Sequence, residues 1–180
     1  MTSRIALRRF RKSDFSFFIA WTQAKEVWKA TVIGDYHLVE ASDPGIKAWF
    51  TRDLLANHHA FVIERTSDAH PIGTVGLKSI VANEAEIQIT IGEVPEWGKG
   101  YGREAIQLLS RHAFVEMKLD RILGKVLRTN SRALAFYQKL GFIVSDTPPN
   151  MVTVSLDRMR YLANQASSAI GTEAAPQPET

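Results

Sequence analysis

Cysteine is absent from all 180 residues of this chain. Its absence excludes disulfides, thiolate nucleophiles and iron–sulfur clusters, and it removes the commonest ligands of structural zinc sites. The five histidines do not follow the His-Glu-x-x-His spacing of a zinc site either, so we expect no metal. Any chemistry that the chain performs must depend on other groups.

The chain also lacks long apolar runs and a strong excess of one charge. No stretch of about 18 consecutive apolar residues occurs, and no apolar signal region follows the basic first residues. We therefore expect a cytoplasmic protein without a membrane partner. The net charge is only +3, and apart from residues 8–12 the basic residues are scattered, so we expect no nucleic-acid partner. The remaining composition, 45% hydrophobic and 23% charged, is typical of one globular domain.

Short runs of apolar and β-branched residues predict the strands. Their ranges are residues 5–7, 60–64, 72–81, 84–91, 121–127, 142–144 and 152–156. In the fourth of these, Ala85, Ile87, Ile89 and Ile91 alternate with polar residues, which predicts one buried and one solvated face. The second and third strands are expected to form an antiparallel hairpin across the turn-forming residues 67–71.

Apolar residues at helical spacing predict four helices between these strands. The first is expected to begin at Asp14, after the N-cap Ser13, and to continue toward a break near Gly34. The others begin at Pro44, after the glycine-rich residues 97–103, and at Arg132. Asp43 and Ser131 are the expected N-caps of the second and fourth helices.

The third helix determines how two of the strands pair. Because a full helix separates residues 84–91 from residues 121–127, those strands are expected to be parallel. From about Ala163 the residues are small and polar, too poor in apolar groups to offset the entropy of ordering. We therefore divide the chain into one folded domain, residues 1–162, and a flexible C-terminal tail, residues 163–180.

Residues 97–103 read Trp-Gly-Lys-Gly-Tyr-Gly-Arg and join the fourth strand to the third helix. Alternate glycines let a ligand approach the backbone closely, and the start of a helix offers unpaired N–H groups and a positive dipole end. This combination is typical of an anion-binding loop, above all for phosphate. It does not fit a P-loop, which needs Gly-Lys-Ser/Thr after a four-residue spacer, or the dinucleotide fingerprint, whose third glycine is replaced here by Arg103.

The spacing of Gly100 and Gly102 instead fits the acyl-coenzyme A signature Gln/Arg-x-x-Gly-x-Gly/Ala, and it resembles the GNAT superfamily of N-acetyltransferases. A second motif supports the resemblance: residues 130–142 are similar to the family pattern Asn-x-x-Ala-x-x-Phe/Tyr-Tyr-x-Lys-x-Gly-Phe. The similarity runs from about Ile5 to Leu156 and is closest to the ribosomal-protein-alanine acetyltransferase branch. Trp97 departs from the pattern, because many relatives carry Gln or Arg there.

The resemblance implies an α+β fold, with a mixed, mostly antiparallel sheet of six to seven strands, a parallel central pair and about four flanking helices. It also implies acetyl-CoA as the acyl donor. The residues implied to bind this cosubstrate are Ile91, Gly98, Lys99, Gly100, Tyr101, Gly102, Arg103, Asn130 and Tyr137. For Asn130 the alternative is a local role, in which its amide satisfies neighbouring backbone groups.

We expect two catalytic residues: Tyr137, which the resemblance implies, and Glu86, which we select from the strand pattern. By resemblance, Tyr137 donates a proton to the departing coenzyme A thiolate, as a phenol of pKa about 10 can do. Tyr137 also shares a helix face with Ala133 and Leu134, so its alternative is a core aromatic. As the base for the attacking amine we select Glu86, on the polar face of its strand, with Glu93 second. The alternatives are that these carboxylates are merely solvated or that a water chain removes the proton.

The sequence therefore predicts an acetyl-CoA-dependent N-acetyltransferase in which an amine attacks the thioester directly in a ternary complex. A protein N-terminal amine, with a pKa near 8, is easier to deprotonate than a lysine or polyamine amine near 10.4 and is the leading acceptor. Small amines, such as polyamines, amino acids or antibiotics, are the alternative acceptors. A catalytically silent acyl-CoA sensor is the alternative function on the same fold. A homodimer would be in keeping with the family that the chain resembles.

Overall fold

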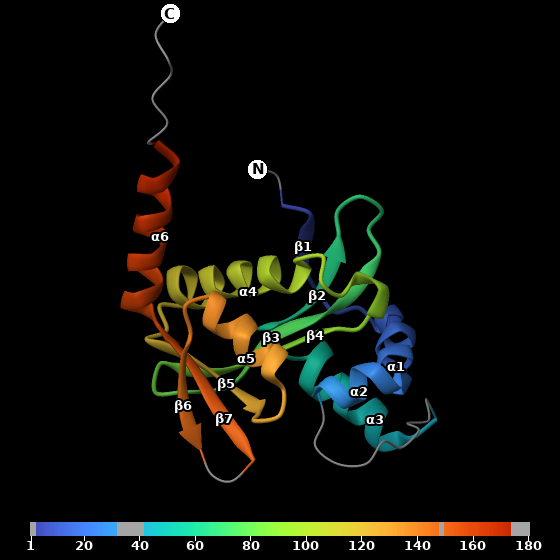
Figure 1. The fold of residues 1–180 in the computed structure, drawn as a ribbon. Coiled ribbons are helices and arrows are strands. Elements are labelled where there is room, and N and C mark those ends of the chain that lie inside the picture. The colour runs from blue at the N-terminus through green and yellow to red at the C-terminus, as the bar shows by residue number, and fades with distance from the viewer. Residues whose placement is uncertain (1–2, 32–41, 148–149, 174–180) are drawn as a thin grey trace, which may run out of the picture.

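The computed structural model describes residues 3–31, 42–147 and 150–173 and contains one seven-stranded sheet (Figure 1). The strands lie in the order β1-β2-β3-β4-β5-β7-β6. Their bounds are β1 Ile5–Arg9, β2 Ala60–Arg65, β3 Pro71–Val81, β4 Glu84–Ile91, β5 Arg121–Leu127, β6 Ile143–Thr147 and β7 Met151–Asp157. Only β4 and β5 are parallel, and all other neighbours are antiparallel, which confirms the predicted mixed sheet with a parallel central pair.

Six α-helices accompany the sheet in the described part of the chain, two more than predicted. They are α1 Phe15–Gln23, α2 Lys25–Thr31, α3 Pro44–Trp49, α4 Tyr101–Arg111, α5 Ser131–Lys139 and α6 Arg158–Glu173. Short turns of other helix types adjoin α1, α3 and α4 at η1 Lys12–Asp14, η2 Phe50–Leu55 and η4 His112–Glu116, and a separate 3-10 turn, η3 Val94–Glu96, follows β4. None of the described helices is long and apolar enough to cross a lipid bilayer.

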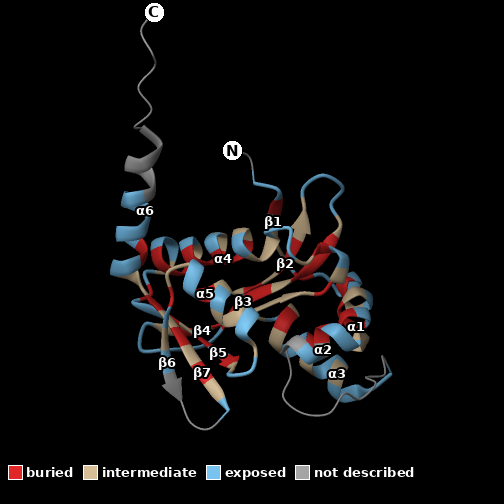
Figure 2. Cartoon of the chain, in the orientation of Figure 1, coloured by how far each residue is buried: buried red, intermediate tan, exposed pale blue. Residues whose placement is uncertain are grey.

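The two faces of the sheet are covered by different helices. Alternate residues of β2 show this: Ile63 belongs to the core cluster that includes Ile106 and Leu109 of α4, whereas Val62 belongs to the cluster that includes Phe50 of η2. Neighbouring residues of a strand point to opposite faces, so α4 packs on one face and η2 on the other. Figure 2 shows the buried residues along the sheet and on the inner side of α4.

The entry to the first helix differs from the prediction. Ser13 is not the N-cap, because the chain enters the helix through the 3-10 turn η1. The carboxylate of Asp14 accepts hydrogen bonds from the Arg11 N–H at 2.7 Å and from the guanidinium of Arg8 at 2.8 Å. The helix also ends early, since extended backbone at Ala24 separates α1 from α2. The expected break near Gly34 lies outside the described residues.

The other two predicted caps have different outcomes. Asp43 is the N-cap of α3, and its side chain accepts a hydrogen bond from the Gly45 N–H at 2.7 Å, as predicted. Ser131 is not the cap of α5, because it is already the first helical residue. The cap is Asn130, whose Oδ1 accepts from the Ala133 N–H at 3.0 Å.

The C-terminal region contains a helix that the sequence did not predict. α6 covers Arg158–Glu173 and is anchored by Tyr161, which is buried against Phe114, and by Arg160, which donates to the Gly141 carbonyl at 2.7 Å. Residues 163–167 are exposed. The boundary at residue 162 and the flexibility of the residues after it remain predictions.

Candidate active site

The sheet opens between its two parallel strands. β4 and β5 pair only at Glu84 with Arg121, Ala85 with Ile122 and Glu86 with Leu123. Beyond this point β4 pairs only with β3, and β5 pairs only with β7. Residues 87–91 and 124–127 therefore border a gap with backbone edges that do not pair across it. Such edges offer hydrogen-bonding groups to an extended ligand.

Tyr137 lies at the start of this opening. A Cβ atom built on Gly124 would lie 3.9 Å from Cζ of Tyr137 and 3.2 Å from Cγ2 of Ile87, so the phenol ring sits beside both strands. Tyr137 is 6% exposed, and its ring packs edge-on against Phe136 and Phe142. The structure thus places the predicted acid at the point where β4 and β5 part.

The state of the Tyr137 hydroxyl suits a proton donor. Burial raises the pKa of Tyr137 to about 12, so the phenol stays protonated at neutral pH. No residue in the described part of the chain forms a hydrogen bond with this hydroxyl. A buried O–H group without a protein partner is costly unless water or a ligand satisfies it. The core-aromatic alternative accounts for the packing of the ring but not for the hydroxyl.

The glycine-rich segment connects η3 to α4. Gly98 and Gly100 have φ angles of +82° and +91°, in the left-handed region where a side chain is strained. No atom lies within 4 Å of a Cβ built on Gly98, so the space above it is open. No side chain caps α4, whose first N–H groups are therefore left for a ligand. This backbone is suited to an anionic group such as a diphosphate.

The third glycine has a different role. Gly102 is helical, and a Cβ built on it would lie 3.6 Å from Phe136, which is ordinary van der Waals contact. Its small size is therefore not required by backbone conformation. Tyr101, the first residue of α4, lies under the guanidinium of Arg4 at 4.9 Å, and Arg4 also donates to the Lys99 carbonyl at 3.0 Å.

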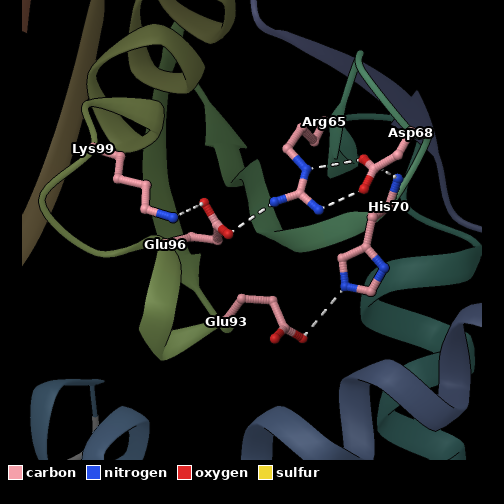
Figure 3. A network of polar contacts seen from close by, with 6 residues as sticks. All are labelled: Arg65, Asp68, His70, Glu93, Glu96 and Lys99. Carbon is pink, nitrogen blue, oxygen red and sulfur yellow. Dashed lines mark hydrogen bonds and ion pairs between the residues drawn. The ribbon is translucent and has the colours of Figure 1, made fainter.

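A network of charged side chains fixes the entry to this segment (Figure 3). Glu96 is 9% exposed and accepts hydrogen bonds from Arg65 at 2.8 Å and from the Lys99 ammonium at 3.0 Å. Arg65 also binds Asp68, which lowers the pKa of that carboxyl to about 2. Lys99, which the resemblance implies in cosubstrate binding, is thus paired with Glu96, whereas Arg103 is exposed on the first turn of α4.

The two candidate bases lie in separate settings. Glu86 forms an ion pair with Lys78 on β3, at 3.0 Å, and its side chain is 23% exposed. It follows Ala85 and precedes Ile87, so it points to the face opposite Tyr137. Glu93 accepts a hydrogen bond from the indole N–H of Trp21 at 2.8 Å. The structure does not join either carboxylate to Tyr137 by a direct contact.

A cavity of about 240 Å³ lies on the same face as Glu86. It is bordered by α3, η2 and the strands β2 to β4, and it reaches Gln88, the second residue after the point where β4 and β5 part. Its polar lining residues are Asp53, Asn57, Thr74, Lys78 and Gln88, and Trp49 supplies an aromatic wall. The opening in the sheet therefore has a buried phenol on one face and a polar cavity on the other.

The remaining predicted contacts have their own partners. The Ile91 carbonyl accepts a hydrogen bond from the Trp97 indole N–H at 2.8 Å. Asn130 caps α5, which is the local role left open for it, and a contact with the donor stays a prediction. Sequence reasoning missed Arg65 and Glu96 as well as the cavity, because they join segments that no motif connects. Among the described residues no group of His, Asp and Glu side chains is arranged to hold a metal ion.

Comparisons with known proteins show which family the chain is similar to. A family model described as an acetyltransferase (GNAT) domain matches residues 4–143. An uncharacterized N-acetyltransferase, p20, of Bacillus licheniformis is 29% identical over 78% of this chain and 80% of its own length. The probable N-acetyltransferase YjcK of Bacillus subtilis is 32% identical over 60% of this chain and 61% of its own length.

Solved structures share the fold at low identity. A spermidine N-acetyltransferase of Vibrio cholerae, in complex with CoA and spermine, has a TM-score of 0.75 and 21% identity over 89% of this chain and 99% of its own. A domain from Methanocaldococcus jannaschii has a TM-score of 0.73 and 19% identity over 87% of this chain and 99% of its own. At this level of identity the similarity concerns the fold.

Proposed function

The chain belongs to the GNAT family of acetyltransferases, and we propose that it transfers an acetyl group from acetyl-CoA to a primary amine, with a protein N-terminal amine as the leading acceptor. The observation that carries this proposal is the opening between β4 and β5, which has Tyr137 at its start and the glycine-rich segment at its outer end. One extended ligand, with a diphosphate and a thioester, would span both.

The residues of the chain divide the work between them. Acetyl-CoA supplies the acetyl group as a thioester. The backbone of residues 98–103 binds the diphosphate, and the unpaired edges of β4 and β5 hold the extended arm. Tyr137, kept protonated by burial, gives its proton to the sulfur that leaves. The chain has no cysteine for a covalent acyl-enzyme, so the amine attacks the thioester directly.

The acceptor would reach the thioester from the other face of the sheet. The cavity lined by Trp49, Asp53 and Gln88 lies there, and Glu86 is tied to its wall through Lys78. In this proposal Glu86 takes the proton of the attacking amine, directly or through water. An N-terminal amine is the leading acceptor because more of it is neutral at pH 7.

A small cationic amine is the second candidate acceptor. The ring of Trp49 in the cavity wall would attract a cation, and the Asp53 carboxylate beside it, although paired with Arg52, contributes negative charge. The proposal also draws on the spermidine N-acetyltransferase that shares this fold. A polyamine would use these groups for its distant charges, whereas a peptide would need only its first residue in the cavity.

Release of free thiol tests the proposal directly, because the cysteine-free chain adds no background to a thiol reagent. Acetyl-CoA is incubated with peptides that have free N-termini, the same peptides N-acetylated, and polyamines. We expect thiol release with free peptides and none with blocked ones. Turnover with polyamines alone would replace the leading acceptor by the second. Tight binding of acetyl-CoA without turnover of any amine would favour the sensor function.

A further inference from the structure

Trp97 precedes the glycine-rich segment and has no polar atom left for a ligand. Its indole N–H, the only donor of the side chain, is used by the Ile91 carbonyl at 2.8 Å. The ring therefore closes the end of β4 onto the loop. A side-chain contact from position 97 to a phosphate is excluded in this conformation.

A cation from another element lies over the ring of Trp97. The guanidinium carbon of Arg132 is 5.2 Å from the ring centroid, within the range of a cation–π contact. Arg132 is the second residue of α5, which follows β5. The contact thus connects the two sides of the opening in the sheet, at the end where the loop of residues 98–100 begins.

Arg132 differs in its partners from Lys99 and Arg4, two other cations around this loop. The Lys99 ammonium is paired with Glu96, and the guanidinium of Arg4 is paired with Glu104. Arg132 is exposed and forms no hydrogen bond or ion pair with any described residue. Its N–H donors are therefore held beside the loop by stacking alone. A stacked guanidinium is preorganised for two parallel hydrogen bonds to a phosphate.

We propose that Arg132 binds the diphosphate of acetyl-CoA from the α5 side, opposite the backbone of the glycine-rich segment, and that Trp97 is a positioning residue for it. This inference rests on the proposed function. Arg132 supplies a cation to the diphosphate, which Trp97 cannot do. The ring of Trp97 restricts the rotamers of Arg132 before acetyl-CoA binds. The diphosphate then lies between the N–H groups at the start of α4 and the guanidinium.

Three acyl donors test the position of Arg132. Acetyl-CoA has the diphosphate and the 3′-phosphate, acetyl-3′-dephospho-CoA has only the diphosphate, and S-acetylpantetheine has neither. For Arg132→Gln we expect KM to rise about 10- to 100-fold with the first two donors, as for the loss of charge-assisted hydrogen bonds, with kcat little changed. With S-acetylpantetheine the variant should equal the wild type. Arg132→Lys should recover part of the loss, because it keeps the charge but not the planar fork.

The control is Arg111→Gln, at the far end of α4 and about 15 Å along the helix from Tyr101. It should not change KM for any donor. An equal loss with all three donors would mean that Arg132 only supports the opening, and a loss confined to acetyl-CoA would place it at the 3′-phosphate. Either result, or no loss at all, overturns the proposal.

Trp97 provides an independent readout. Trp97→Leu should weaken coenzyme A binding in the wild-type background and add little in Arg132→Gln, because its effect passes through Arg132. Calorimetric Kd values for coenzyme A measure this coupling without turnover. A chain that binds coenzyme A but acetylates no amine would therefore refute the proposed function while still testing Arg132. Fully additive effects of the two substitutions would remove the positioning role.

Discussion

The carboxylate of Glu96 accepts a hydrogen bond from the guanidinium of Arg65, at 2.8 Å, although 31 residues separate them in the chain. Arg65 ends β2, and Glu96 ends the turn before the glycine-rich segment. Lys99, inside that segment, binds the other oxygen of the same carboxylate. Glu96 therefore holds the glycine-rich segment against the β2–β3 hairpin.

We expect Glu96→Gln to loosen this loop. A misplaced loop binds the diphosphate less well, so KM for acetyl-CoA should rise about 10-fold, with a smaller change in kcat. The matched control is Asp68→Asn, which also removes a partner of Arg65 but does not touch the loop. Steady-state kinetics of the two variants should differ. If Asp68→Asn raises KM as much as Glu96→Gln does, the hairpin rather than the loop contact is responsible.

Gly100 and Gly102 should respond differently to substitution, although both belong to the same signature. Gly100→Val places a side chain at a φ of +91°, 3.1 Å from the Arg4 guanidinium, and we expect the Kd of acetyl-CoA to rise about 10- to 100-fold. Gly102→Ala adds a Cβ in ordinary contact with Phe136 and should bind nearly as the wild type does. Calorimetry on variants with native-like melting curves measures both. Unchanged affinity in a folded Gly100→Val protein would refute the phosphate-binding role of the loop.

Tyr137→Phe removes only the hydroxyl and keeps the ring packing. We expect kcat to fall about 10- to 1,000-fold, at the modest end of general-acid effects, with the melting temperature unchanged. Because burial raises the pKa of Tyr137 to about 12, ionisation of this phenol should not reduce wild-type activity until the pH approaches that value. A pH–rate profile of the wild type up to pH 10 checks whether ionisation of Tyr137 lowers activity. A fully active Phe variant would make Tyr137 a packing residue.

Glu86→Gln tests the base. Loss of the carboxylate should lower kcat/KM about 100-fold for an amine acceptor at every pH of the pH–rate profile. Lys78→Met breaks the same ion pair but leaves the carboxylate, so it should keep most of the activity. An unchanged profile in Glu86→Gln would remove Glu86 as the base. In that case Glu93→Gln tests the second candidate for the general base.

The parts of the fold that could be predicted are those determined by local pattern. Period-two alternation located β4 within its observed bounds, and the intervening helix made β5 parallel to it. The break at Ala24 could not be predicted, because the residues on both sides have helical spacing and alanine is a strong helix former. Asn130 and Ser131 are adjacent residues that both cap helices well, and only the backbone shows which one does.

The candidate site shows the same division. Residues 97–103 and Tyr137 each belong to a sequence motif, so they could be selected from the sequence. The pairs formed by Arg65 with Glu96 and by Arg132 with Trp97 join segments that are 31 and 35 positions apart, and no spacing rule predicts such contacts. They result from the way the sheet brings a hairpin and a second helix to the same loop. These contacts restrict the position of the glycine-rich loop. Composition and periodicity give no information about such contacts.

A pair of histidines away from the opening should make stability depend on pH. His59 Nδ1 lies 3.2 Å from His112 Nε2, a distance that suits one shared proton and not two positive charges. Burial lowers the pKa of His59 below its ordinary value of 6.5, and the nearby charges of His112, His58 and Arg9 lower it further. Well above pH 6.5 His59 is neutral in both the folded and unfolded states, so it has no effect on the pH dependence of stability there.

As the pH falls through 6.5 the unfolded state takes up a proton at His59 before the folded state does. The free energy of unfolding must therefore decrease as the pH falls, down to the folded pKa, and then level off. We expect urea midpoints to fall between about pH 6.5 and pH 5, a window above that in which carboxylates protonate. His59→Gln, which keeps a polar side chain, should have a shallower slope in that window. An identical slope in the two proteins would show that this histidine pair does not couple folding to pH.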